Sequence, residues 1–160
     1  MKNQFRKIDI VVFAFTLMAI LGMVLYLIIT WKTIPNQIPA KYTSAGEVLS
    51  YESKSSLLTF PIVLLVLSVT LVVVSLFPTA WNMPTVKITP KNEPYVRVCI
   101  RSMIDIMLLL ITIDMSVMFL YLANAKPIPI PLLIGLGVIF VGNAIFWIIR
   151  TIRVAKRVGE

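Results

Sequence analysis

Residues that could carry out chemistry are few in this chain of 160 residues. Histidine is absent and Cys99 is the only cysteine. There is therefore no imidazole metal ligand, no Ser-His or Cys-His couple and no disulfide within the chain. The sequence also contains no GxSxG motif and shows no paired acids at matched depth. We therefore expect a protein that is not an enzyme and that has no catalytic residues, metal or cofactor.

Asp114 is the polar residue in the most unusual setting, near the middle of a long apolar run. An ionised carboxylate at such a depth in a bilayer costs about 2.5 to 3.5 kcal/mol, and each neighbouring apolar residue contributes roughly 0.3 to 0.6 kcal/mol toward insertion. Two interpretations stay open. Asp114 is either a functional group facing protein or water, or a protonated structural residue that hydrogen-bonds to another helix. The candidate partners are Asn143, Thr16, Ser68 and Thr70.

Apolar runs of membrane-spanning length provide the elements that must position these residues. The chain is 59% hydrophobic and only 14% charged, and its mean hydropathy is +0.94. A soluble protein of this size has too little polar surface to cover so much apolar surface. About 20 apolar residues span the hydrocarbon core as a helix. We predict an all-α membrane protein, a single domain over 1–160, with four transmembrane helices at about 10–31, 57–77, 104–123 and 131–149.

The basic residues predict the orientation of these helices. Eleven Lys and Arg lie at the N-terminus, in the 78–102 loop and in the C-terminal tail, whereas four lie in the other two loops. Cytoplasmic loops carry the excess of Lys and Arg. Both termini are therefore predicted to be cytoplasmic, with the 32–54 loop external. The net charge of +8 is then explained by orientation. The expected partner is the lipid bilayer, and no nucleic-acid partner is expected.

The predicted external loop carries the most specific pattern in the sequence. Pro35 and Pro39 each follow an isoleucine, Gly46 comes seven residues after Pro39, and Lys54 and Pro61 flank the start of the next helix. The prolines stiffen the backbone, and glycine permits a positive φ. Read without any family, the loop is either an ordered structural cap or a surface for a ligand.

This pattern resembles a bacterial membrane-protein family of unknown function, whose domain also forms the N-terminal part of the SdpI immunity protein. The positions that match the family are Pro35, Pro39, Gly46, Lys54 and Pro61. Two positions depart from it, because Lys41 replaces the usual histidine and Leu49 replaces a frequent aspartate. Metal or proton chemistry that depends on that histidine and aspartate is therefore not carried over.

The resemblance implies a multi-pass protein of the bacterial cell (inner) membrane. It favours a non-enzymatic accessory protein with an immunity or regulatory role, whose external loop senses or blocks an extracellular peptide or another membrane protein. The alternative is a small transporter or channel in which Asp114 lines a polar path. The predicted ligand or structural loop residues are Pro35, Pro39, Lys41, Gly46, Glu47, Lys54 and Pro61, and the intramembrane polar pair is Asp114 and Asn143.

Two ion pairs are also predicted. Lys54 precedes a helix N-terminus, where a lone cation is unfavourable, so we expect it to pair with Glu47 or Glu52. Arg101 lies one helical turn before Asp105, and this i, i+4 spacing allows a structural pair.

The orientation gives the first testable prediction. In a chain whose Cys99 is replaced, a cysteine at Ser44 should react with an impermeant thiol reagent on intact cells, and one at Thr89 only after permeabilisation. The reverse labelling pattern would contradict the assignment of both termini to the cytoplasm.

Overall fold

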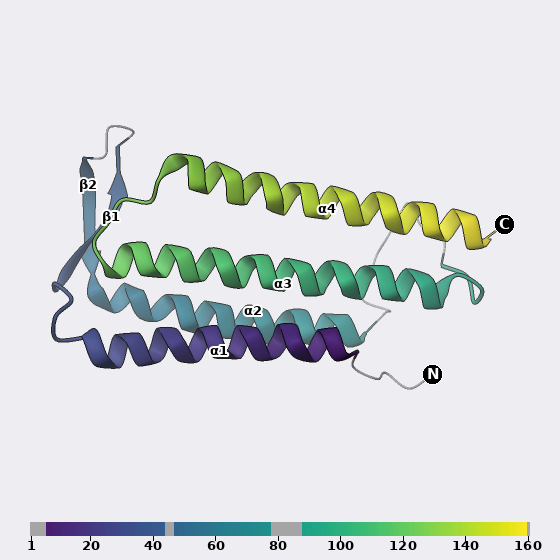
Figure 1. Ribbon diagram of the computed structural model, residues 1–160, viewed down its shortest axis with the longest axis horizontal. Coiled ribbons are helices and arrows are strands. Elements are labelled where there is room, and N and C mark those ends of the chain that lie inside the picture. The colour runs from purple at the N-terminus through teal and green to yellow at the C-terminus, as the bar shows by residue number, and fades with distance from the viewer. Residues whose placement is uncertain (1–5, 44–46, 78–87, 160) are drawn as a thin grey trace.

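Four long helices form the body of the molecule in the computed structural model, which describes residues 6–43, 47–77 and 88–159. They are α1 (Lys7–Thr30), α2 (Thr59–Leu76), α3 (Glu93–Ala123) and α4 (Ile130–Gly159), and they lie side by side lengthwise (Figure 1). Each is long and apolar enough to cross a membrane. The predicted fold of four transmembrane helices is confirmed, and the chain is a multi-pass membrane protein.

Two helices are longer than their predicted spans. Helix α3 has 31 residues and begins at Glu93, and α4 has 30 residues and ends at Gly159. At 1.5 Å per residue they are roughly 46 and 45 Å long, whereas the hydrocarbon core is about 30 Å thick. The first turns of α3 and the last turns of α4 therefore extend beyond the apolar layer. Hydropathy missed these turns because Arg97, Arg101 and Arg153 lower the average without interrupting a helix.

A β-hairpin between α1 and α2 was not predicted. Strands β1 (Gln37–Tyr42) and β2 (Val48–Ser53) form an antiparallel sheet, and the 3-10 helix η1 (Lys54–Leu58) leads into α2. The hairpin lies at one end of the helices, which we call the hairpin end; α1 begins and α4 ends at the opposite end (Figure 1). We call that opposite end the charged end, because buried ion pairs join α1 to α3 there.

Apolar packing fixes the hairpin on the helices. Ile38 of β1 and Leu57 of η1 are fully buried, in one cluster with Leu27 of α1 and Phe119 of α3. The Phe119 ring makes T-shaped contacts with Tyr26 of α1 and Phe60 of α2, at centroid distances of 5.7 Å and 6.0 Å. Such contacts join α1, α2, α3 and the hairpin into one packed unit.

Helices α1 and α3 also share a polar contact deep in the apolar layer. The hydroxyls of Thr16 and Thr112 are 3.0 Å apart, and both residues are fully buried. Each hydroxyl also reaches a carbonyl four residues earlier in its own helix, that of Val12 at 3.0 Å and that of Leu108 at 2.8 Å. Hydrogen bonds of this kind hold transmembrane helices together where hydrophobic burial gives no driving force.

Helix α4 is the peripheral helix. It packs mainly on α3, which lies between α4 and the other two helices (Figure 1). The packing includes Val96, Ile100 and Ala155, and the buried Asn92 donates from Nδ2 to the Ala155 carbonyl at 3.3 Å. These contacts lie at the charged end, so the rest of α4 presents much of its apolar surface outward.

Candidate functional site

Lys54 anchors the hairpin to the end of α1. Its Nζ donates to the backbone carbonyl of Trp31 at 3.2 Å and lies 5.0 Å from the centroid of the Trp31 ring. Within the described ranges no ion pair joins Lys54 to Glu47 or Glu52, so the predicted partners are wrong. The reason is that the end of α1 lies beside Lys54. Its terminal carbonyls carry partial negative charge, and a cation is favourable there.

The outer face of the hairpin is apolar. Leu49 and Tyr51 are 65% and 59% exposed, and Tyr51 pairs with Pro39 across the sheet. Side chains alternate along a strand, so these three residues share the face opposite the buried Ile38. Burial, followed by the nearby Tyr51, raises the pKa of the Tyr42 phenol above its ordinary value. The hairpin thus presents a fixed apolar surface.

The other predicted loop residues occupy different surroundings. Lys41 is exposed on β1, Glu47 is exposed just before β2, and Pro35 is exposed before β1. Pro61 is buried in the first turn of α2, where a missing N–H leaves no intrahelical bond unmade. Gly46 lies outside the described residues. The structure therefore brings Pro39 and Lys41 to the hairpin, whereas Pro61 is a packing residue.

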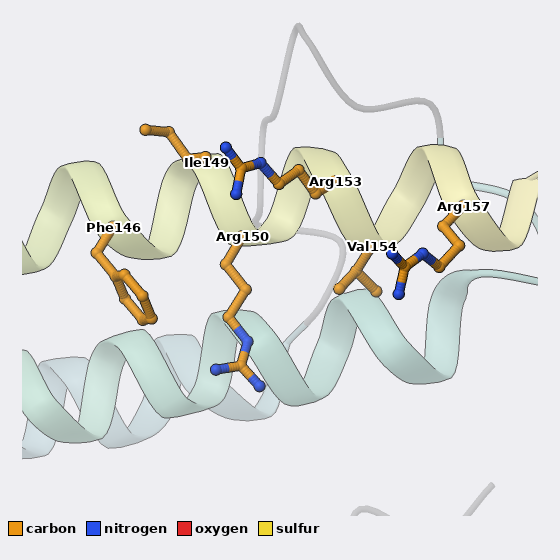
Figure 2. A pocket seen from close by; sticks show the side chains of 6 residues that line it. All are labelled: Phe146, Ile149, Arg150, Arg153, Val154 and Arg157. Carbon is orange, nitrogen blue, oxygen red and sulfur yellow. The ribbon is translucent and has the colours of Figure 1, made fainter.

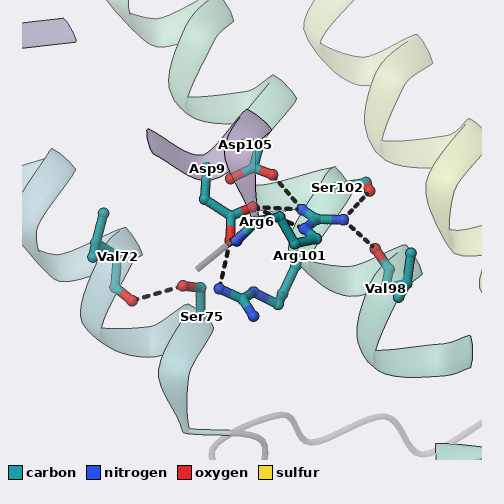
Figure 3. A network of polar contacts seen from close by, with 8 residues as sticks. All are labelled: Arg6, Asp9, Val72, Ser75, Val98, Arg101, Ser102 and Asp105. Atoms are coloured by element: carbon teal, nitrogen blue, oxygen red, sulfur yellow. Dashed lines mark hydrogen bonds and ion pairs between the residues drawn. The ribbon is translucent and has the colours of Figure 1, made fainter. Parts of the chain in front are cut away.

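A network of four charged residues closes the charged end (Figure 3). Arg101 of α3 donates to Asp9 of α1 at 2.5 Å, and their side chains are only 7% and 9% exposed. Arg6 Nη2 bridges Asp9, at 2.8 Å, and Asp105. Arg6 Nη1 donates to Ser102 at 2.8 Å. The network thus links α1 and the residue before it to α3, and removing one member of a buried ion pair is costly because the other charge is left uncompensated.

The network corrects one expectation and extends another. Asp9 and Asp105 lie side by side at the same cavity, although no such acid pair was recognised in the sequence. Arg101 and Asp105 interact electrostatically within α3, and each also forms an ion pair with α1 or the residue before it. A cavity of about 250 Å³ also reaches both aspartates, with walls from α1, α2 and α3. Its other lining residues are Ile10, Phe13, Val72, Ser75, Ile104 and Leu108.

Asp114 lines a separate cavity of about 440 Å³ between α2, α3 and α4. The remaining walls are apolar, with Met115 and Met118 on α3 and Gly137 and Phe140 on α4 among them. Over the parts of the chain that the structure describes, Asp114 has no hydrogen-bond partner. Each predicted partner is engaged or oriented elsewhere. Thr16 bonds Thr112, Ser68 and Thr70 bond carbonyls of α2, and the buried Nδ2 of Asn143 is unpaired among the described residues.

Comparison with known families bears on the hairpin and its flanking helices. Residues 18–65 match a family model described as a domain of unknown function. A DUF1648 domain is present here. It includes most of α1, the hairpin, η1 and the first turns of α2, and thus less than half of the chain. DUF1648 is commonly a membrane-protein domain. No curated protein matches the chain, and no solved structure matches it.

The DUF1648 domain contains every predicted loop residue from Pro35 to Pro61, whereas Asp114 and Asn143 lie outside it. Sequence reasoning missed Arg6, Asp9 and Ser102 as members of the charged network. The sequence carried a signal for Arg6 and Asp9. An Arg and an Asp three residues apart at the start of a transmembrane helix make its insertion into the membrane costly unless the two charges are paired.

The network gives the second prediction. Replacing Asp9 alone with Leu removes the carboxylate that Arg6 and the buried Arg101 both contact, and should destabilise the fold by about 3 to 5 kcal/mol because positive charge at this site is then less well compensated. Asp9→Leu combined with Arg101→Met should recover most of this loss. Unfolding in detergent, followed by circular dichroism, measures both variants.

Glu93→Gln is the matched control, because Glu93 pairs with Arg97 at 2.7 Å with a 42% exposed side chain. An exposed i, i+4 pair contributes only about 0.3 to 0.5 kcal/mol. If Asp9→Leu cost no more than Glu93→Gln, the network would not hold the charged end together.

Proposed function

We propose that this protein is a non-enzymatic accessory protein of the bacterial cell membrane, with an immunity or regulatory role like that of SdpI. Its hairpin faces outward and binds an extracellular peptide or an exposed segment of another membrane protein. The observation that carries the proposal is an apolar surface, containing Leu49 and Tyr51, on a hairpin that Ile38 and Lys54 fix rigidly to the helices.

The shape of the hairpin supports recognition of an extended peptide. A two-stranded sheet has unpaired backbone groups along its outer edges, and a peptide can add there as a further strand. Alternate side chains of that peptide would then meet Leu49, Tyr51 and Pro39 on one face. Because the helices hold the hairpin in place, binding would not require the loop to become ordered first, which favours affinity.

The outward orientation is supported by the division of basic residues along the sequence, eleven in the N-terminus, the 78–102 segment and the C-terminal tail against four in the other two connections, since the side with the excess is cytoplasmic. The same division fits a bacterial inner membrane. The proposed role requires no cofactor and no reaction, since blocking or sensing needs only a surface.

The third prediction tests the hairpin surface. A sensitive bacterium that expresses this chain should tolerate a higher concentration of a membrane-active secreted peptide. Leu49→Ser combined with Tyr51→Ser should remove that protection by weakening peptide binding at least tenfold, because both side chains supply exposed apolar contact area. The minimal inhibitory concentration is the measurement, with protein abundance and thermal unfolding followed in parallel.

The matched control changes two exposed residues near the same end but outside the hairpin, Thr33→Ser with Lys126→Gln. It should protect as well as the original chain. Full protection by the Leu49 and Tyr51 variant, at equal abundance, would exclude the hairpin face as the binding surface.

A second candidate function rests on the cavity beside Asp114. A carboxylate in an otherwise apolar intramembrane cavity is typical of a path for a proton or a cation. We propose this transport role as the alternative. In it α4, the span with the smallest share of buried residues, moves relative to α3 to open the cavity.

The fourth prediction separates the two candidates. Asp114→Leu should leave the thermal midpoint unchanged or raise it, because no described protein group loses a partner and a polar group leaves the apolar layer. In proteoliposomes a transporter would lose its proton or cation flux with both Asp114→Leu and Asp114→Asn. If Asp114→Leu instead unfolded the protein while Asp114→Asn did not, Asp114 would be a structural hydrogen-bonding residue.

A further inference from the structure

A cationic cavity of about 470 Å³ lies along the last turns of α4. Figure 2 shows its lining side chains, which are Phe146, Ile149, Arg150, Arg153, Val154 and Arg157. Phe146, Arg150, Arg153 and Arg157 follow one another at steps of four, three and four residues, so they form one stripe along the helix. The cavity is apolar toward the membrane-spanning part of α4 and basic toward the C-terminal end of that helix.

Internal carboxylates do not balance these arginines. The chain has seven acidic residues. Asp9, Asp105 and Glu93 contact Arg6, Arg101 and Arg97. Glu47 and Glu52 belong to the hairpin at the other end, and Asp114 lies in mid-span. Glu160 is outside the described residues, and the 78–87 segment contains no acidic residue. Within the described ranges no ion pair reaches Arg150, Arg153 or Arg157.

Arg150 is held in position by aromatic rings. Its guanidinium carbon lies 5.1 Å from the centroid of the Trp147 ring and 6.0 Å from that of Phe146. Stacking of this kind leaves the planar donors of the guanidinium available for an anion. Arg153 and Arg157 follow at one-turn intervals and are exposed.

We propose that this cavity binds the headgroup of an anionic phospholipid. The phosphate would lie between Arg150, Arg153 and Arg157, and an acyl chain would lie along Phe146 and Ile149, which are exposed on the membrane side. The order of the two surfaces matches the order of the two parts of a lipid. Basic pockets at the ends of transmembrane helices recognise anionic headgroups in this way. Lipid binding at this site does not depend on the function of the hairpin.

The test uses the full chain purified in a neutral detergent. It is titrated separately with dioleoyl phosphatidylglycerol, dioleoyl phosphatidylcholine and inorganic phosphate. Native mass spectrometry counts the bound lipid, and thermal unfolding is followed in parallel. Phosphatidylglycerol should bind at least tenfold more tightly than phosphatidylcholine, and phosphate alone should not raise the thermal midpoint.

Arg153→Gln combined with Arg157→Gln should weaken phosphatidylglycerol binding roughly thirtyfold, since each basic residue near a headgroup contributes roughly a fivefold factor. Both side chains are exposed, so the fold should persist. Lys91→Gln combined with Lys156→Gln is the matched control. It removes two exposed charges from the same end but none from the cavity, and should change binding less than threefold.

Arg150→Lys provides an independent check, because it keeps the charge but loses the planar stacking geometry. It should weaken binding several-fold without altering unfolding. Equal losses in the arginine and lysine pairs would show a diffuse surface potential and overturn the proposal. Stabilisation by inorganic phosphate alone, or equal affinity for both lipids, would also overturn it.

Discussion

Apolar side chains gain little by leaving lipid for a protein interior, so hydrophobic burial does not decide how transmembrane helices pair. In this chain polar contacts make that decision, and they join α1 to α3 at two depths. The charged network holds Asp9 against Arg101 at one end, and the threonine pair Thr16 and Thr112 lies deeper. Helix α2 completes the unit through Leu64 and Phe60, which pack in the cluster around Phe119. The position of every other element depends on this pairing.

Helix α4 packs on α3, but few of its contacts are polar. The hydrogen bond that the buried Asn92 donates to the Ala155 carbonyl of α4 lies at the charged end. Among the described residues no such hydrogen bond joins the middle of α4 to α3. The Asp114 cavity lies along that middle part. A polar side chain that lines an otherwise apolar cavity is open to a ligand or an ion. The same feature explains why Asp114 and Asn143 were predicted to bond and do not, because sequence gives their depth but not the rotation or separation of their helices.

The sequence predicted what is local and failed on what depends on contacts between distant segments. Twenty apolar residues in a row predict a membrane span whatever they contact, so all four spans were found. The hairpin was missed because Pro35 and Pro39 are typical of a stiff loop, and because Ile38 becomes a core residue only once Leu57 and Phe119 surround it. Lys54 was assigned to nearby acids. Its partner Trp31 lies 23 residues away, and only the folded loop returns Lys54 to the end of α1.

The two ends of the molecule are stabilised by different forces, and this difference bears on what each end can do. At the hairpin end, water is the solvent, so burial of Ile38 and Leu57 contributes the usual hydrophobic free energy. That packing leaves Leu49 and Tyr51 outside it and open to a partner. At the charged end, Asp9 and Asp105 are used in pairing α1 with α3, and Glu93 is paired with Arg97. The arginines of α4 are therefore left to interact with anions in their surroundings. At the edge of a bilayer those anions are headgroup phosphates. Because the acidic residues at the charged end are already paired inside the bundle, the arginines of α4 make that end the one that attracts headgroup phosphates.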